Sequence, residues 1–254
     1  MELKRSENLS GSLKKAKQIL EYVSQNQGEM RQVDIQKYLS MKKTTAHRYF
    51  EALEEMNFLE KKNDRYFLGL ELLRLGNKVQ SRNLILHSLN PILEAIVSEI
   101  NETVNVAQFN GDSATYIQRV ESSRNLQFRV ALGDNLPLYC TGLGKAILSL
   151  LSDHQVKNLV DEIPFIKFTE NTITDKRTLL NQVNEIREKG YAVECEEFEE
   201  GLICLSVPLY FETYDFTGAI SFSGTTNRID KETLIEVFDK IKPQILQIKN
   251  KFNK

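Results

Sequence analysis

The feature that most constrains this chain is a pair of short amphipathic helices followed at once by two short strands, all within residues 32–69. The spacing of apolar residues predicts the helices over 32–39 and 42–56, and the segments 58–62 and 65–69 read as strands. In each helix one face is apolar, as burial against a common core requires. These apolar positions are Val33, Ile35 and Leu39 in the first helix, and Ala46, Tyr49, Phe50, Leu53 and Met56 in the second.

A further helix precedes this pair, and a tight turn joins the two strands. Apolar residues from Leu13 to Val23 predict a helix over about 12–25, which Asn26-Gln27-Gly28 ends. Asn63-Asp64 lies between the two strands and suits a hairpin turn. The order helix, helix, helix, hairpin is that of a winged helix-turn-helix, a fold that binds double-stranded DNA.

Polar and basic side chains occupy the outer face of the second helix of the pair and the hairpin beside it. These residue types bond phosphates and base edges in a major groove. A charged face on an isolated helix is more often simply solvated, but the wing that follows favours DNA binding. We expect DNA contacts from Lys42, Lys43, Thr44, Thr45, His47 and Arg48 on the helix, and from Lys61, Lys62 and Arg65 on the hairpin.

Charge and composition agree with a DNA-binding module joined to a different kind of domain. The net charge of −2 divides into +3 over residues 1–70 and −5 over the remainder. The apolar run 146–151 is far too short to cross a bilayer, which takes about 20 residues. The polar segment 1–12 does not resemble a signal peptide. We therefore expect a cytoplasmic protein with no membrane partner.

The cysteines and histidines do not indicate an enzyme. No spacing of histidine, serine or cysteine suggests a catalytic set or a zinc site, so we expect no catalytic residue, no metal and no cofactor. One alternative stays open, a redox- or metal-sensing regulator that uses Cys140, Cys195 or Cys204. Cys140 and Cys204 have apolar neighbours, and Cys195 has neighbouring carboxylates. Both environments argue against reactive thiols.

The rear of the chain changes from helical to strand-like periodicity. A linker helix is predicted over 71–89, and Pro91 is expected to open the next helix. Strands are then predicted over the following segments, before a last helix over 231–252: 104–109, 114–120, 126–130, 203–209 and 218–222.

Two features of this rear part suit a small anion. Small residues over 137–145 lead into a helix predicted at 146–151, and free N–H groups at a helix start favour an anion such as a carboxylate. Ser221 and Ser223 alternate along one strand, so their hydroxyls point to the same side. Strand serines that bond only their neighbours remain the alternative from these residues alone.

Taken together, the motifs resemble those of the IclR family of bacterial transcription regulators. They occur in the family's order over nearly the whole chain, which makes the resemblance specific. The matching segments are Thr44-Thr45-Ala46-His47-Arg48, Glu102-Thr103-Val104-Asn105, Tyr116-Ile117-Gln118-Arg119-Val120, Thr141-Gly142-Leu143-Gly144-Lys145-Ala146, Thr172-Ile173-Thr174-Asp175, Gly190-Tyr191-Ala192-Val193, Glu196–Cys204 and Ala219-Ile220-Ser221-Phe222-Ser223-Gly224.

The resemblance implies an α+β fold class and a regulator of transcription, expected to be a repressor. It implies a winged helix-turn-helix over 1–70, a helical linker over 71–89, and a GAF-like α/β effector-binding domain with an antiparallel sheet over 90–254. It also implies a homodimer or homotetramer that binds a palindromic operator and responds to a small organic acid.

The resemblance further implies where that acid binds. By motif position the pocket includes the N–H groups of Gly142 and Leu143, the side chains of Glu194 and Cys204, and the hydroxyls of Ser221 and Ser223. Many relatives have aspartate at the place of Glu194, and some have a smaller residue at the place of Leu143. The bulkier side chains of this chain argue against a very small keto acid.

Overall fold

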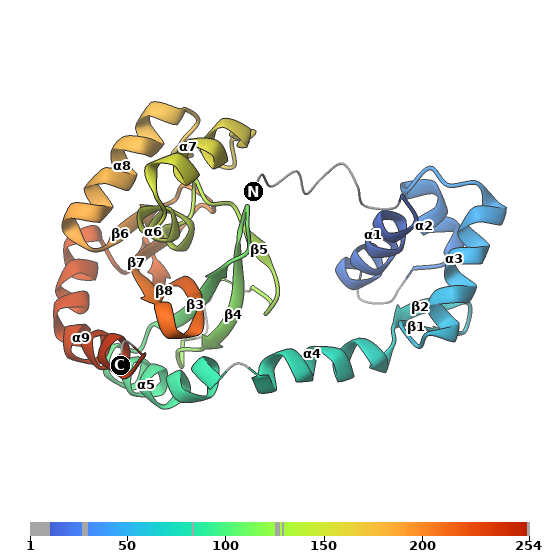
Figure 1. Ribbon diagram of the computed structural model, residues 1–254, viewed down its shortest axis with the longest axis horizontal. Coiled ribbons are helices and arrows are strands. Elements are labelled where there is room, and N and C mark those ends of the chain that lie inside the picture. Colours follow the sequence, from blue (N-terminus) through green and yellow to red (C-terminus); the bar gives the residue numbers. More distant parts are fainter. Residues whose placement is uncertain (1–10, 27–29, 83, 125–127, 129, 253–254) are drawn as a thin grey trace. The chain divides into compact units, whose positions relative to one another are not determined.

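The computed structural model describes residues 11–26, 30–82, 84–124, 128 and 130–252. The chain divides into two compact units, Met1–Asn83 and Leu84–Lys254, each with its own core. Figure 1 labels their helices and strands. Within the described ranges, no helix combines the length and the apolar character that crossing a membrane requires.

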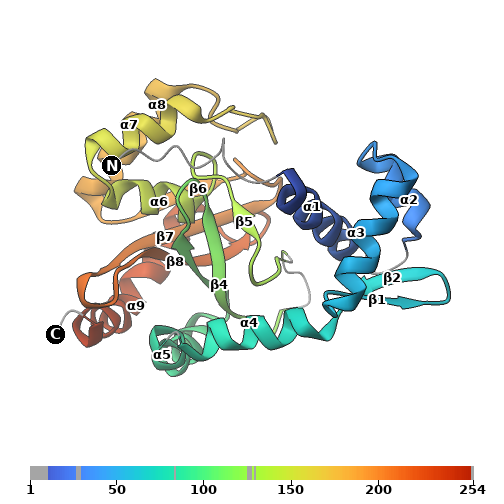
Figure 2. The same cartoon turned by 45° about the vertical axis from the view of Figure 1, so that its right-hand side comes forward.

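The front unit is the winged helix-turn-helix that the sequence predicts. Its elements are α1 (Gly11–Gln25), α2 (Gln32–Tyr38), α3 (Lys43–Glu55), β1 (Leu59–Lys62), β2 (Arg65–Leu68) and α4 (Leu70–Arg82). The three helices and the hairpin enclose one core, made of Ile19, Val23, Ile35, Met41, Ala46, Phe50, Leu53, Leu59 and Tyr66. Figure 2 shows the hairpin extending away from the three helices.

Two residues predicted to be buried are exposed. Met56 is 48% exposed because α3 ends at Glu55, so that Met56 no longer follows the buried stripe of the helix. Val33 is 43% exposed because α2 is a helix of only 7 residues whose one buried side chain is Ile35.

The hairpin turn follows from its two residues. Asn63 and Asp64 have φ angles of 49° and 62°, and Lys62 pairs directly with Arg65 across the strands. A two-residue loop with both φ angles positive matches the twist of antiparallel strands, and asparagine and aspartate tolerate that conformation best after glycine.

The helical stretch predicted as one linker over 71–89 is divided between two helices. α4 ends at Arg82, and α5 (Leu84–Ile100) already belongs to the rear unit, where Ile85 and Leu89 are buried. Pro91 lies inside α5 rather than at its start. Proline removes one helical hydrogen bond, and the buried residues on either side of it hold the helix in place.

The rear unit is built on a six-stranded antiparallel sheet in the order β5-β4-β3-β8-β7-β6. Its strands are β3 (Thr103–Phe109), β4 (Ala114–Val120), β5 (Asn135–Leu136), β6 (Ala192–Cys195), β7 (Leu202–Phe211) and β8 (Phe216–Thr225), with the short 3-10 helix η1 (Glu212–Tyr214) between the last two. The strand predicted over 126–130 lies mostly outside the described residues, and Phe128 and Val130 are not in a strand.

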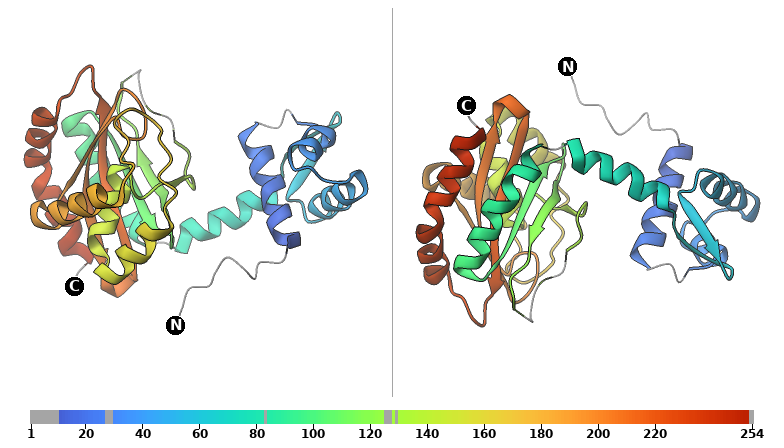
Figure 3. Two further views of the ribbon diagram at one scale, coloured as in Figure 1. Left: turned by 90° about the horizontal axis from the view of Figure 1, so that it is seen from above. Right: turned by 90° about the horizontal axis from the view of Figure 1, so that it is seen from below.

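Helices cover both faces of this sheet, as Figure 3 shows. On one face, α5 and α9 (Lys231–Phe252) pack on apolar strand residues such as Val104, Leu205 and Phe222. On the other face, α6 (Gly142–Leu150) packs on the sheet and in turn against α8 (Lys176–Lys189), with α7 (Asp153–Glu162) beside it. The two faces therefore have separate cores.

A prediction about the front unit concerns Gly69, at the bend between β2 and α4. A Cβ atom at this position would collide with the backbone carbonyl of Asn57, and the amide of Gly69 donates to the carbonyl of Phe58 at 2.8 Å. We expect Gly69→Ala to destabilise the front unit by about 1–3 kcal/mol, because the backbone must move.

Gly76→Ala is the matched control, since a Cβ atom there meets nothing within 4 Å. It lies inside α4, where alanine is favoured over glycine by about 0.5–1 kcal/mol. Hydrogen exchange of amides in residues 11–68 reports both changes. Equal protection in the two variants would contradict the close approach at Gly69.

Candidate functional site

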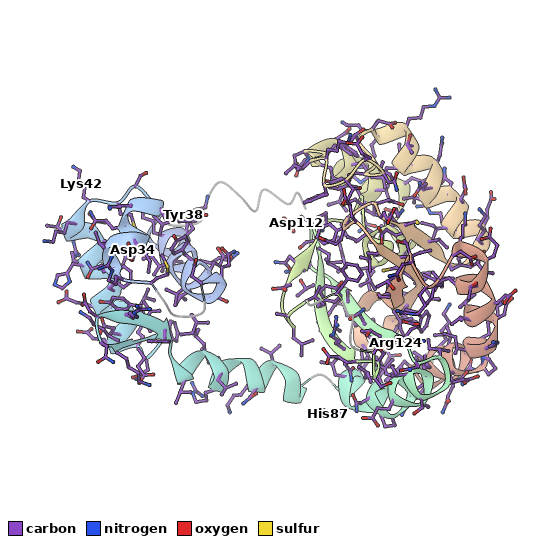
Figure 4. All side chains as sticks on the ribbon, turned by 180° about the vertical axis from the view of Figure 1, so that it is seen from behind. Asp34, Tyr38, Lys42, His87, Asp112 and Arg124 are labelled. Atoms are coloured by element: carbon purple, nitrogen blue, oxygen red, sulfur yellow. The ribbon has the colours of Figure 1, made fainter. Side chains whose placement is uncertain are left out.

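The front unit presents the predicted basic residues on one helix and one hairpin. Lys42, Lys43, Thr44, His47 and Arg48 at the start of α3 are exposed, and Thr45 is half-buried beside them. Figure 4 shows the Lys42 side chain pointing away from the ribbon of the front unit. The structure thus places these residues together on the outer surface of α3.

Some of these charges already have partners of opposite sign. His47 lies 3.3 Å from Glu51, Lys61 lies 2.9 Å from Asp64, and Lys62 lies 2.9 Å from Glu60. In contrast, Lys42, Lys43, Arg48 and Arg65 form no ion pair within the described part of the chain. Exposed ion pairs contribute little to stability, so a phosphate group can replace the acidic partner at small cost. The arrangement therefore remains suitable for the phosphate backbone of a nucleic acid.

In the rear unit, strand register lines up polar side chains on the face of the sheet that α6 covers. Ser221 of β8 lies between Asn105 of β3 and Ser206 of β7, and Ser223 lies next to Cys204. Cys204 in turn pairs with Glu194 of β6. As the alternation along β8 predicts, Ser221 and Ser223 are on one face.

Hydrogen bonds connect several members of these rows. The side-chain amide nitrogen of Asn105 donates to Ser223 at 3.2 Å and more weakly to Ser221 at 3.5 Å. The Arg119 guanidinium donates to the side-chain oxygen of Asn105 at 3.3 Å, and the Cys204 thiol donates to Ser223 at 3.2 Å. The polar face is therefore a connected network from β4 to β7.

The helix α6 begins directly above this network. It starts at Gly142, four residues earlier than the apolar pattern 146–151 indicates, because the Thr141 hydroxyl caps it by accepting from the Gly144 amide at 3.0 Å. Gly144 is held between backbone atoms of Pro137 and Leu138 that leave no room for a Cβ. The amides of Gly142 and Leu143 have no acceptor in the described part of the chain, as is normal for a helix start.

A cavity of about 100 Å³ lies between α6 and the polar strands. All six residues predicted to bind an effector line it: Gly142, Leu143, Glu194, Cys204, Ser221 and Ser223. Several further wall residues are not predicted from the sequence: Glu102, Asn105, Tyr116, Arg119, Phe198, Ser206 and Arg228. Alternation along β3 and β7 could have indicated Asn105 and Ser206, but only with the pairing of distant strands known.

Two buried ion pairs stiffen the surroundings of the cavity. The fully buried Lys145 ammonium bonds both carboxylate oxygens of Glu197, at 2.5 and 2.7 Å, and Gln182 at 2.8 Å. On another side, buried Glu102 accepts from Arg228 at 2.7 Å and pairs with Arg124 at 3.1 Å. Because each charge is paired, the network is rigid rather than strained.

Glu194 is a buried titratable group in the wall of the cavity. Its carboxylate accepts from the amides of Glu197 at 2.6 Å and Phe198 at 3.3 Å. Burial raises the pKa of Glu194 from 4.5 to about 7, and the charge of Glu197 adds to this rise. The group is thus close to half-protonated at neutral pH.

The surroundings of all three thiols disfavour the thiolate form. Burial raises the pKa of Cys140 to about 12 and that of Cys204 well above 9.0. Cys195 is exposed, but partial desolvation and the carboxylate of Glu196 raise its pKa as well. Within the residues that the structure describes, no three histidine, cysteine or acidic side chains gather in a way that could hold a metal ion.

Comparison with known proteins gives matches to both units. Residues 77–250 match the family model of the bacterial transcriptional regulator IclR C-terminal domain, and residues 12–63 match that of the IclR helix-turn-helix domain. The transcriptional regulator KipR of Bacillus subtilis is 29% identical over 212 residues, which cover 83% of this chain and 85% of KipR. The transcriptional repressor AllR of Escherichia coli is 28% identical over 219 residues, covering 85% and 81%.

Solved structures show the same arrangement of elements. The crystal structure of Thermotoga maritima IclR aligns with a TM-score of 0.75 and 31% identity over 96% of this chain and 99% of that one. An IclR regulator from Alicyclobacillus acidocaldarius aligns with a TM-score of 0.81 at 22% identity, over 97% of this chain and 100% of that one, and so supports the fold.

A prediction about pH follows from Glu194. Its pKa is about 7 in the folded protein and about 4.5 in the unfolded chain, so the folded protein binds an extra proton between these values. The stabilisation is therefore complete below pH 4.5 and is lost as the pH rises to 7, by up to about 3 kcal/mol. Urea unfolding of the rear unit from pH 5 to 8 measures this loss, and Glu194→Gln should remove it.

Glu185→Gln is the control for this measurement. Lys189 lowers the pKa of Glu185, which is exposed, so its charge does not change between pH 5 and 8. We expect this variant to keep the wild-type pH profile. If Glu194→Gln also kept it, the buried carboxyl would not be the group that titrates.

Proposed function

Since the chain belongs to the IclR family of bacterial transcriptional regulators, we propose that it binds a specific operator through α3 and its wing, and that a small organic acid in the rear cavity modulates this binding. The observation that supports the second part is the cavity itself, where free helix amides meet strand hydroxyls in a buried space. The relatives found by comparison are transcriptional regulators, and this chain is proposed to act in the cytoplasm, where the DNA is.

The DNA-binding role of particular residues is inferred from exposure and charge. The start of α3 presents Lys43, Thr44 and Arg48 on its solvent side, and the hairpin carries three basic residues around its turn. In winged helix proteins of this build, the second helix of the pair reads bases and the wing holds phosphates. We propose that Arg48 contacts base edges, while Lys42, Lys61, Lys62 and Arg65 contact the backbone.

We propose a homodimer, alone or paired into a homotetramer, on a palindromic operator. The helix α4, which leads from the wing towards the rear unit in the chain, exposes large apolar side chains: Leu70 is 77% exposed, Leu73 59% and Val79 72%. Apolar side chains gathered on one exposed helix favour contact with a second copy. A twofold dimer of DNA-binding heads matches a palindromic site.

The cavity suits an acid for chemical reasons. Carboxylates bind strongly to N–H and O–H donors that converge in a desolvated place. The amides of Gly142 and Leu143 and the hydroxyls of Ser221 and Ser223 are such donors, with Glu194 and Cys204 as further polar wall groups. We propose that the acid stabilises one arrangement of this wall and thereby alters DNA binding. The relative AllR is a transcriptional repressor, and we propose that this chain is a repressor too.

A redox-sensing alternative has less support. The nucleophile in thiol oxidation is the thiolate, and all three thiols have a raised pKa. An organic acid is thus favoured over an oxidant as the signal.

The DNA contact is tested by Arg48→Ala. We expect its affinity for the operator to fall by about tenfold to a hundredfold, because one base contact is lost, while the fold is unchanged since Arg48 is exposed. Gel-shift titrations at one fixed salt concentration measure the change in affinity. The operator fragments are taken from the promoter region of the gene that encodes this chain.

Lys17→Ala provides the matched control. Lys17 lies on α1, pairs with Glu21 and is likewise exposed, so the variant loses the same charge away from α3. Its operator affinity should stay within about twofold of wild type. An equal effect of both variants would indicate general electrostatics and remove Arg48 from the base-reading surface.

The effector is tested by thermal shift of the full chain against a panel of keto, hydroxy, aromatic, sugar and dicarboxylic acids. A ligand at a hundredfold excess over its Kd should raise the Tm of the rear unit by about 5 °C or more. The double variant Ser221→Ala/Ser223→Ala should lose most of that rise. Ser149→Ala, in α6 but outside the cavity wall, should keep it, and no shift with any acid would contradict an acid effector.

A further inference from the structure

Ser206 has a buried hydroxyl that nothing in the described chain satisfies. Its side chain is 0% exposed, and no hydrogen-bond partner reaches its Oγ within the described ranges. A buried hydroxyl without a partner costs about 1–3 kcal/mol. Ser206 lines the cavity, although its Oγ is covered by the start of α6 in the free protein. A ligand that satisfies this hydroxyl therefore does so with a small shift of the wall.

The Ser206 hydroxyl lies against the start of α6. A Cβ atom at Gly142 would be 2.6 Å from this Oγ, so only glycine lets the helix come this close. The unpaired amides of Gly142 and Leu143 are at the same place. One hydroxyl and two amides therefore lie together at this end of the cavity, and such a group of donors suits one carboxylate.

Arg119 supplies donors at the other end. Its side chain is 9% exposed, and it lines the cavity from β4. Its guanidinium uses three N–H groups, towards Glu121 at 3.2 Å, Asn105 at 3.3 Å and the Phe128 carbonyl at 2.7 Å. A guanidinium has five N–H donors, so two remain without an acceptor among the described residues.

Strand register gives the separation of the two donor sets. Ser206, Ser221, Asn105 and Arg119 are direct partners on four adjacent strands. The Arg119 guanidinium reaches back over β3 to within 3.3 Å of the Asn105 side-chain oxygen, so two strand spacings separate it from Ser206. Two strand spacings are about 10 Å. Subtracting about 3 Å for a hydrogen bond at each end leaves about 4 Å, which is the separation of the two carboxylates in a short diacid.

We propose that the effector is a dicarboxylic acid of about four or five carbons, with one carboxylate on Ser206, Gly142 and Leu143 and the other on Arg119. This rests on the proposed function, namely that the cavity binds an organic acid. In this assignment Arg119 and Ser206 determine specificity, since a monocarboxylate fills only one of the two donor sets.

The carboxylates in the wall are compatible with such a ligand. Glu102 is neutralised by Arg228 and Arg124, and Glu199 is exposed to solvent. Glu194, nearest to Gly142, already accepts two backbone hydrogen bonds and takes up a proton readily, because burial raises its pKa. At the Gly142 end the remaining repulsion is that of the partly ionised Glu194, which protonation on binding removes. At the Arg119 end Glu121 is exposed and already paired with Arg119.

Isothermal titration of the full chain with matched acids tests the proposal. Succinate and glutarate are compared with butyrate and pentanoate, which have the same lengths but one carboxylate. We expect at least one diacid to bind about tenfold or more tightly than its monoacid. Equal affinities, or no binding of either diacid up to about 10 mM, would overturn the proposal.

Variants of the two specificity residues sharpen the test. Arg119→Gln should reduce the affinity for the diacid to that for the monoacid, and Arg119→Lys should retain part of the preference. Arg187→Gln is the control. Like Arg119, Arg187 donates hydrogen bonds to backbone carbonyls in the rear unit, but it does not line the cavity. If Arg119→Gln kept the full preference, the second carboxylate would not be at Arg119.

Ser206→Ala separates a binding role from a structural one. No hydrogen bond is lost in the free protein, so we expect its Tm to stay the same or to rise, while the diacid affinity falls about tenfold. A lowered Tm with unchanged affinity would overturn the assignment of Ser206. If both diacids failed but another acid of the wider panel bound, this inference would fall while the proposed function stood.

Discussion

The period-two alternation of β7 and β8 is the constraint on which the rear unit depends. Leu205 and Phe222 face the core beneath α5 and α9, whereas Ser206 and Ser221 face the cavity. A slip of one residue would put hydroxyls into the apolar core and leucine into the cavity. Because both strands are bonded on each side within the sheet, this register is fixed, and one face is free to be polar.

The buried polar groups of this face divide into those that are satisfied and those that are not. Lys145 and Glu197 bond each other closely, and the amide of Glu197 bonds Glu194. Breaking a buried ion pair is strongly destabilising, so this part of the wall stays fixed. The hydroxyl of Ser206 and the first amides of α6 lack partners in the described chain. These unmet hydrogen bonds lie in the cavity wall, beside the space that a ligand would occupy.

Local patterns in the sequence predict the helices and the hairpin of the front unit, although not the exposure of Val33 and Met56, and they do not predict the whole cavity. The stripe of α3 and the Asn63-Asp64 turn depend on neighbours in the chain, so periodicity and turn chemistry predict them. Ser221 and Ser223 could be related to each other for the same reason. Asn105 and Ser206 could not, because each is placed by pairing with Ser221 across more than a dozen residues of sequence. Likewise, Pro91 reads as a helix start, and only burial of the residues around it shows otherwise.

The same register gives a physical path by which a ligand could bias the rest of the chain. Asn105 faces the cavity from β3, whereas Val104 and Val106, its neighbours, pack in the core with Leu89 and Leu93 of α5. A ligand that changes the hydrogen bonds of Asn105 with Ser221 or Arg119 therefore acts on β3, the strand that supports α5.

In the chain, α4 ends at Arg82 and α5 begins at Leu84, so α5 is the first element of the rear unit after the wing and α4. A ligand shifts such a system only by binding two arrangements of β3 with different affinity. The network from Arg119 to Ser223 is where that difference in contacts would arise, because its hydrogen bonds exist on both sides of Asn105.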